Sequence, residues 1–168
     1  MRLAGKIAIV TGAARGFGEG IARTFAREGA RLVLADLDAA GVARLAAEIG
    51  AQAAAVAADV SRGPDVEAIV AAALARFGGI DIVVNNAGTT HRNRPMLEVD
   101  EDIFDRVYAV NVKSLYWMAR ATVPVLRAQG RGGSIINIGS TGGIRPRPGL
   151  VWYNGSKAAV NVIGMCMA

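Results

Sequence analysis

Cysteine, histidine and aromatic residues are scarce in this sequence of 168 residues. Cys166 is the only cysteine and His91 the only histidine, so neither an internal disulfide nor a metal site built from several cysteines or histidines can form. The longest uninterrupted apolar run covers residues 68–75, far short of the roughly 20 residues of a membrane-spanning helix. The apolar stretch within residues 1–20 is too short for a signal peptide. We therefore expect a cytoplasmic protein with no metal and no membrane partner.

Basic residues outnumber acidic ones, which gives a formal net charge of +5 and raises the question of nucleic-acid binding. The 19 basic residues are scattered along the chain, and the densest pairs are Arg92 with Arg94 and Arg145 with Arg147. Only 5% of the residues are aromatic, so few side chains can stack on bases. The sequence therefore favours a protein without a nucleic-acid partner.

Two kinds of segment alternate along the chain. Short apolar runs occupy residues 7–10, 32–35, 53–58, 82–84 and 135–138. Longer stretches with helical spacing of apolar residues occupy residues 19–28, 39–49, 65–77 and 104–129. Because the short runs are nearly continuous, they are typical of strands buried on both faces of a parallel sheet. This order predicts an α/β fold with a doubly wound, Rossmann-type parallel sheet in three layers, α/β/α.

A glycine-rich segment, Thr-Gly-Ala-Ala-Arg-Gly-Phe-Gly at residues 11–18, follows the first expected strand and opens the first expected helix. There, a glycine-rich turn lets the backbone approach a pyrophosphate held at the helix N-terminus, although the segment alone is also compatible with an ordinary turn. Asp36 ends the second expected strand, where a carboxylate can accept hydrogen bonds from an adenosine ribose. Asp36 or Asp38 could instead cap the next helix, and Asp38 suits the cap better.

Tyr153 and Lys157 are four residues apart in an expected helix, so their side chains project from one face. A free tyrosine has a pKa of about 10 and is a poor base at neutral pH. A nearby ammonium favours the phenolate and lowers that pKa, so the pair can serve as a general acid/base for an alcohol or carbonyl oxygen. The alternative is a tyrosine and a lysine on a helix surface.

Two further polar residues are candidates for chemistry. Ser140 follows the last expected strand, at the edge of a parallel sheet where ligands bind, and Thr141 beside it is an alternative. Asn111 lies in an apolar helical stretch, either as an interior amide or as a functional residue.

Four motifs in this order resemble the short-chain dehydrogenase/reductase family over nearly the whole chain. They are the glycine-rich segment, Asn-Asn-Ala-Gly at residues 85–88, Ser140, and Tyr153 with Lys157. The resemblance implies an NAD(P)-dependent oxidoreductase that transfers a hydride between a nicotinamide cofactor and a secondary alcohol or ketone. It also implies four catalytic residues. Ser140, which the family places 13 residues before the tyrosine, would orient the substrate oxygen, and Tyr153 would exchange its proton. Lys157 and Asn111 would complete the proton relay, with Asn111 holding a water.

The resemblance further implies a set of cofactor contacts. They are Gly12, Arg15, Gly16, Phe17, Gly18, Asp36, Asp59, Val60, Asn86, Ala87, Gly88, Tyr153 and Lys157. Within this set, Asp59 and Val60 would line the adenine pocket, and residues 86–88 would pass beside the cofactor ribose. Asn85 would help to tie the central strands together.

We expect NAD rather than NADP as the cofactor. The Asp36 carboxylate would repel a phosphate at the ribose 2′ position and accept a hydrogen bond from a free hydroxyl there. Arg15 favours NADP instead, since a basic residue at this position pairs with the 2′-phosphate in some relatives. The carboxylate should dominate, because its hydrogen bonds to the ribose are lost when the phosphate is present.

Two other functions remain compatible with the sequence. One is a catalytically inactive nucleotide-binding or structural module on the same fold, and the other is epimerisation or dehydration of nucleotide sugars. The family also implies a small-molecule alcohol or ketone as substrate and a homodimer or homotetramer. Residues 160–168 read as the middle of an apolar helix, and family members are longer. We therefore expect residues 1–168 to form a single dinucleotide-binding and catalytic domain that lacks its C-terminal third.

Overall fold

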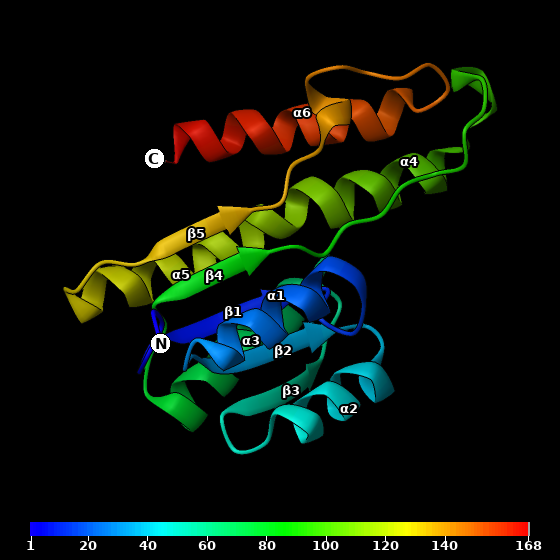
Figure 1. Ribbon diagram of the computed structural model, residues 1–168. Coiled ribbons are helices and arrows are strands. Elements are labelled where there is room, and N and C mark those ends of the chain that lie inside the picture. Colours follow the sequence, from blue (N-terminus) through cyan, green and yellow to red (C-terminus); the bar gives the residue numbers. More distant parts are fainter. Residues whose placement is uncertain (168) are drawn as a thin grey trace.

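The computed structural model describes residues 1–167, and a sheet of five parallel strands lies at its centre (Figure 1). The strands are β1 (Ile7–Thr11), β2 (Arg31–Asp36), β3 (Ala53–Ala57), β4 (Ile82–Asn85) and β5 (Ser134–Asn137). They lie in the order β3-β2-β1-β4-β5, each parallel to its neighbours. This arrangement confirms the predicted doubly wound α/β fold, and each predicted strand lies within one residue of its observed ends.

Helices cover both faces of the sheet, as Figure 1 shows. They are α1 (Gly16–Arg27), α2 (Ala39–Ile49), α3 (Gly63–Phe77), α4 (Glu101–Tyr108), α5 (Ser114–Gln129) and α6 (Val151–Cys166). Helices α1 and α2 bury Ala22 and Leu45 in the core on one face. Helices α3 and α5 bury Ile69 and Met118 in the core on the other. Because β1 is covered on both faces, all five of its residues are buried, which explains its uninterrupted apolar sequence.

Three helices begin earlier than the apolar pattern predicts. Helix α1 begins at Gly16 rather than residue 19, and α3 begins at Gly63 rather than residue 65. Helix α4 begins at Glu101 rather than residue 104. These first turns consist largely of glycine, proline and charged residues, so they carry no apolar spacing. Proline is nevertheless well tolerated in a first turn, as Pro64 is in α3, because the amide that it lacks has no partner there.

The single long helix predicted over residues 104–129 is instead interrupted. A π-helical segment, Ala109–Lys113, separates α4 from α5, and Asn111 lies at its centre. The sequence prediction was wrong here because the apolar pattern continues through the segment. Such π segments widen the helix locally and are frequent at functional sites.

Helix α6 ends at Cys166, and Met167 is its C-cap. The helix predicted over residues 160–168 is therefore confirmed as far as Cys166, and Ala168 lies outside the described residues. Within residues 1–167, no helix combines the length and the apolar character needed to cross a membrane.

The carboxyl ends of the strands gather polar side chains at one edge of the sheet. Thr11, Asp36, Asn85 and Asn137 are the last residues of β1, β2, β4 and β5. The side-chain Nδ2 of Asn85 donates a hydrogen bond of 2.9 Å to Oδ1 of Asn137, which ties β4 to β5 as predicted. The strand order reverses between β1 and β4, and ligands of doubly wound sheets bind in the crevice at that point.

Candidate functional site

The glycine-rich turn after β1 is fixed by its neighbours on β4. Buried Thr11 accepts hydrogen bonds of 3.1 Å at Oγ1 from the backbone amides of Asn86 and Ala87. In return, the side-chain amide of Asn86 donates to the carbonyls of Thr11 (2.8 Å) and Gly12 (3.1 Å). The turn is therefore bound to the end of β4 from both sides.

Each glycine of the turn meets a different constraint. Gly12 has a φ of +64°, and a Cβ there would lie 2.8 Å from Asn86 Nδ2. A Cβ on Gly18 would overlap the carbonyl of Gly12. Gly16 has a φ of +61° but faces open space, so its backbone conformation rather than crowding selects glycine. The turn thus needs small residues for packing at two positions and a left-handed conformation at two.

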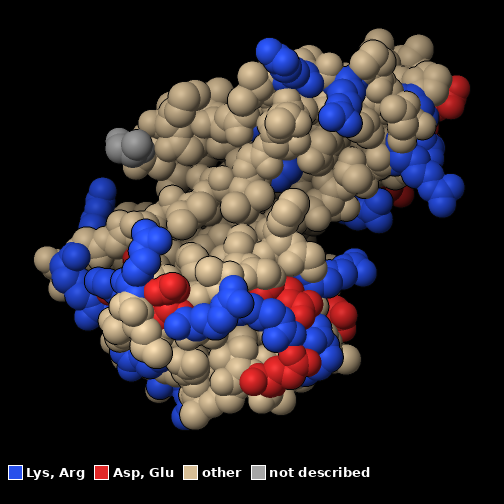
Figure 2. Space-filling model, viewed as in Figure 1, with Lys and Arg blue, Asp and Glu red and all other residues tan. Residues whose placement is uncertain are grey.

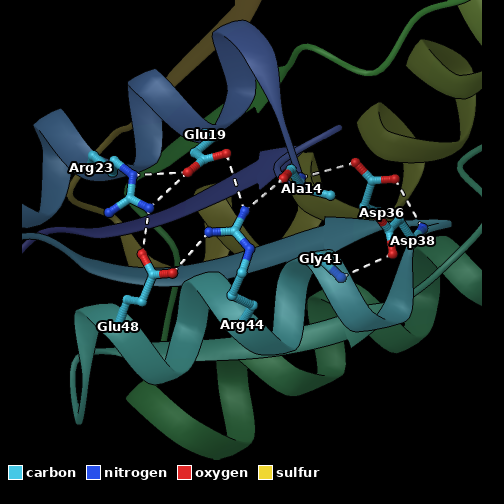
Figure 3. A network of polar contacts seen from close by, with 8 residues as sticks. All are labelled: Ala14, Glu19, Arg23, Asp36, Asp38, Gly41, Arg44 and Glu48. Atoms are coloured by element: carbon cyan, nitrogen blue, oxygen red, sulfur yellow. Dashed lines mark hydrogen bonds and ion pairs between the residues drawn. The ribbon is translucent and has the colours of Figure 1, made fainter.

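Asp36 and Asp38 have separate structural roles (Figure 3). Asp38 is the N-cap of α2 and accepts a hydrogen bond of 2.9 Å from the amide of Gly41, so the predicted cap is confirmed. The Asp36 carboxylate accepts from the amides of Ala14 and Asp38, both at 3.0 Å. Asp36 is therefore already turned toward the glycine-rich turn.

A network of four charged side chains joins α1 to α2 beside this turn (Figure 3). Arg23 pairs with Glu19 and Glu48, and Arg44 pairs with the same two carboxylates. Hydrogen bonds from Arg23 and then Arg44 lower the pKa of both glutamates. Figure 2 shows acidic and basic side chains interspersed over α1 and α2, whereas most of α6 carries no charge on this face. Exposed ion pairs of this kind add little to the free energy of unfolding, so their main effect is to hold the side chains of α1 and α2 in fixed positions.

A cavity of about 490 Å³ lies at the same edge of the sheet. Eight of the predicted cofactor residues line it: Gly12, Arg15, Asp36, Asp59, Val60, Asn86, Ala87 and Gly88. The other five, Gly16, Phe17, Gly18, Tyr153 and Lys157, do not line it, and Phe17 is 83% exposed. The remaining lining residues were not predicted as cofactor contacts, and only their position near the motifs indicates them: Leu37, Asp38, Ala58, Thr89, Arg106 and Val110. Among residues 1–167, no three His, Cys, Asp or Glu side chains are grouped to hold a metal ion.

Asn111 joins α6 to the loop after β4. Its Oδ1 accepts from the amide of Thr89 at 2.8 Å, and its Nδ2 donates to the Thr89 carbonyl and to Ser156 Oγ, both at 2.9 Å. Ser156 in turn donates to the carbonyl of Tyr153 at 2.7 Å. Both protons of Asn111 Nδ2 and one lone pair of its Oδ1 are thus bonded to protein atoms, and among the described residues no hydrogen bond joins Asn111 to Lys157.

Lys157 is only 6% exposed, and its ammonium donates a hydrogen bond of 2.8 Å to the carbonyl of Ile138, just after β5. Burial lowers the pKa of Lys157, because the charged form loses hydration. A Cβ placed on Gly88 would lie 3.5 Å from Lys157 Nζ and 3.4 Å from Asn111 Oδ1. Gly88 also lines the cavity, so Lys157 Nζ and Asn111 Oδ1 lie beside the part of the cavity wall that Gly88 forms.

Ser140 is the N-cap of a short 3-10 turn, Thr141–Gly143, and its Oγ accepts a hydrogen bond of 3.0 Å from the amide of Gly142. A Cβ on Gly142 would lie 3.4 Å from Ser140 Oγ and 3.5 Å from the ring of Tyr153. The structure thus brings Ser140 and Tyr153 to the same glycine. Ser140, rather than Thr141, caps the turn with its side chain.

Asn154 is a site residue that the sequence did not single out. It is buried, and its Nδ2 donates to the carbonyl of Arg147 at 2.8 Å, while its Oδ1 has no hydrogen-bond partner within residues 1–167. A Cβ on Gly142 would lie 2.6 Å from that oxygen. Asn154 therefore fastens the segment between Ser140 and α6. Its signal in the sequence is its spacing with Lys157 and Val160, the next buried positions on one stripe of α6.

Comparison with known proteins places this geometry in a family. Residues 6–168 match the family model described as short chain dehydrogenase. The chain belongs to the short-chain dehydrogenase family. The chain is 53% identical over 163 residues to the 4-formylbenzenesulfonate dehydrogenase TsaC1/TsaC2 of Comamonas testosteroni. It is 43% identical over 160 residues to the galactitol 2-dehydrogenase of Agrobacterium fabrum.

Both alignments cover 95% of this chain, but only 64% and 62% of the lengths of the respective relatives. A solved structure of a 3-ketoacyl-(acyl-carrier-protein) reductase from Brucella melitensis, complexed with NADH, superposes with a TM-score of 0.96 at 47% identity. That match covers 99% of this chain and 70% of the reductase chain. The described fold is therefore shared with this family. The chain spans less than two thirds of the length of the two dehydrogenases from Comamonas testosteroni and Agrobacterium fabrum.

Proposed function

We propose that this short-chain dehydrogenase is an NAD-dependent oxidoreductase that interconverts a secondary alcohol and a ketone by hydride transfer. The observation that carries the proposal is the position of Gly88, which lines the cavity beside the glycine-rich turn and faces Asn111 and Lys157. A dinucleotide in that cavity would reach the polar residues of α6 with one end. Relatives named as dehydrogenases and a similar structure complexed with NADH support the same function.

The turn between β1 and α1 fits the pyrophosphate of a dinucleotide. Arg15 is the N-cap of α1 but its side chain makes no capping hydrogen bond, so the first amides of the helix lack that partner. Gly16 has nothing within 4 Å of the position a Cβ would take, which leaves the backbone accessible. Helix N-termini of this kind favour phosphate groups because their amides and dipole point at the anion. The nicotinamide ring of a bound dinucleotide would accept or donate the hydride.

The residues around Gly142 are suited to proton transfer at a substrate oxygen. The Ser140 oxygen accepts from the Gly142 amide, so its own proton is free to be donated to the substrate. Tyr153 is the proposed general acid/base beside it. The Lys157 ammonium has three protons, one of which bonds to Ile138. The others can bond to ribose hydroxyls and to a relay water.

Asn111 is the proposed fourth member of the relay. Its side chain is already bonded to Thr89 and Ser156, so a relay water would bind to a backbone group of the π-helical segment rather than to the amide. The side chain would then position that backbone.

NAD is the proposed cofactor because Asp36 lines the cavity, at the end of β2. Its carboxylate lies where the adenosine ribose is expected, and a negative charge there disfavours an added phosphate. A titration of the chain with NADH and with NADPH, followed by nicotinamide fluorescence, should give tighter binding of NADH. Tighter binding of NADPH would contradict the preference for NAD.

The reaction itself is tested by a panel of secondary alcohols and ketones, followed by nicotinamide absorbance. Tyr153→Phe removes one oxygen and should lower turnover by about 10² or more, as expected for loss of a general acid/base. Cofactor affinity should stay within error of wild type, because the hydroxyl is not needed to fill the cavity. A variant with normal turnover would show that another group transfers the proton.

A further inference from the structure

Ala14, in the glycine-rich turn, is approached by one residue of β2 and two residues of α2. Asp36 accepts a hydrogen bond from the Ala14 amide at 3.0 Å, and Arg44 donates one to the Ala14 carbonyl at 3.2 Å. A Cβ on Gly41, one turn before Arg44, would lie 2.7 Å from the Ala14 methyl group, so the helix approaches the turn closely. Figure 3 shows Asp36 and Arg44 reaching Ala14 from β2 and α2.

The bond from Arg44 orients the peptide that leads into helix α1. A peptide unit is planar, so fixing the Ala14 carbonyl also fixes the amide of Arg15, which points in the opposite direction. Arg15 lines the cavity and is the N-cap of α1, in an extended conformation with a φ of −160°. The orientation of the Arg15 amide, at the start of the proposed pyrophosphate site, therefore depends on the Ala14 carbonyl.

Arg44 is itself held in place by two carboxylates. Its Nη1 donates to Glu48 at 2.9 Å on its own helix, and its Nη2 donates to Glu19 at 3.2 Å in the first turn of α1. The guanidinium thus bridges the turn, the helix that follows it and α2. Its planar fork suits this task, since it presents several donors in fixed directions.

We propose that Arg44 is a positioning residue for the dinucleotide, which acts by holding the Ala14 carbonyl and with it the amide of Arg15. The inference rests on the proposed dinucleotide site and adds a residue from α2 to it. Arg44 is not one of the residues that line the cavity. Its effect on cofactor affinity must therefore pass through the turn.

Arg23 provides a matched control in the same network. It pairs with the same two glutamates, yet it makes no hydrogen bond to the turn among the described residues. Arg23→Ala and Arg44→Ala therefore remove one arginine each from the network, and only the second removes the bond to Ala14. A purely structural role of the network would affect the two variants alike.

The test is a fluorescence titration of the wild-type chain and both variants with NADH, together with thermal unfolding. Arg44→Ala should weaken NADH binding by about fivefold, the loss expected for one net hydrogen bond of about 1 kcal/mol. Arg23→Ala should stay within about twofold of wild type, because exposed ion pairs contribute little. In amide spectra of the ¹⁵N-labelled proteins, the Arg15 and Gly16 signals should move in Arg44→Ala and not in Arg23→Ala.

Equal NADH affinity of the two variants, at equal unfolding temperature, would overturn the role of Arg44 and leave the proposed function intact. A wild-type chain that binds neither NADH nor NADPH would overturn both. If Arg44→Ala does not fold, Arg44→Lys is read in the same way, since a lysine keeps the charge but loses the fork. Wild-type affinity in Arg44→Lys would then contradict the proposal, and a weaker affinity would support it.

Discussion

The candidate site has two halves that differ in the burial of their strands. The nucleotide half, which is the glycine-rich turn with Asp36 and residues 86–88, follows strands that are largely buried. The proposed catalytic half, which is Ser140, Tyr153, Asn154 and Lys157, lies beyond β5, a strand that is partly exposed. All of β1 and four of the six residues of β2 are buried, while β5 alternates between exposed and half-buried positions. In the first half, four hydrogen bonds that the side chains of Thr11 and Asn86 make to backbone groups, together with close glycine contacts, hold the turn against the end of β4.

In the second half, single side-chain bonds perform the corresponding task. Lys157 bonds to Ile138, Ser140 to Gly142 and Asn154 to the carbonyl of Arg147. The nucleotide half should therefore be most sensitive to added volume, and the catalytic half to lost hydrogen bonds. Substitutions of each kind test this difference.

The largest effect is expected for Gly18→Ala in the nucleotide half. The added methyl group would overlap the Gly12 carbonyl and lie 2.6 Å from Asn86 Nδ2. NADH affinity should fall by about 100-fold, because overpacking a tight site typically costs about 1–3 kcal/mol. Gly20→Ala is the control, since Gly20 lies in the same helix and faces open space. It should keep NADH affinity and stabilise the chain by about 0.5–1 kcal/mol. Equal affinities of the two variants would break the comparison.

A smaller effect is expected for Asn154→Ala in the catalytic half. The change removes the bond to the Arg147 carbonyl and should lower the free energy of unfolding by about 1 kcal/mol. Turnover should fall by about tenfold while NADH affinity is kept, since a small displacement of reacting groups is costly. Asn93→Ala serves as the matched variant, because Asn93 donates to Pro148 in the same segment but is exposed. If it lowered turnover as much as Asn154→Ala, burial of the bond would be irrelevant.

The smallest effect concerns the pH dependence of stability through Lys157. Burial lowers its pKa in the folded chain below the ordinary 10.5, so at alkaline pH the unfolded chain binds more protons than the folded one. The stability of wild type relative to Lys157→Met should therefore rise as pH increases from the folded pKa toward 10.5. Below that window both states are protonated and the difference should be constant. Urea unfolding at a series of pH values measures it, and a decline with rising pH would contradict the burial of the ammonium.

The sheet could be predicted from sequence because burial on both faces leaves a direct signal. The apolar runs at residues 7–10 and 32–35 match β1 and β2 closely, since helices cover both faces of these strands. The interruption at Ala109–Lys113 could not be predicted, because a π-helical segment changes the hydrogen-bond pattern without changing the apolar spacing.

The site residues divide in the same way. Those in local motifs, such as Asp38 as helix cap, follow from the residue type and its neighbours. Arg44 acts on Ala14, 30 residues earlier in the chain, so no local pattern defines its partner. Asn154 bonds to Arg147, only seven residues away, but its approach to Gly142 depends on how the segment before α6 folds. A weak signal exists for Arg44, which forms with Glu48 the only two charges in the otherwise uncharged sequence of α2.

The central claim, that the two halves of the site are separable, is tested most directly by one NADH titration of three proteins. Wild type, Gly18→Ala and Tyr153→Phe are titrated at the same pH and ionic strength, with nicotinamide fluorescence as the signal. The account predicts tight binding to wild type and to Tyr153→Phe, and a loss of about 100-fold in Gly18→Ala. Equal binding to all three proteins, or weakened binding to Tyr153→Phe alone, would contradict it.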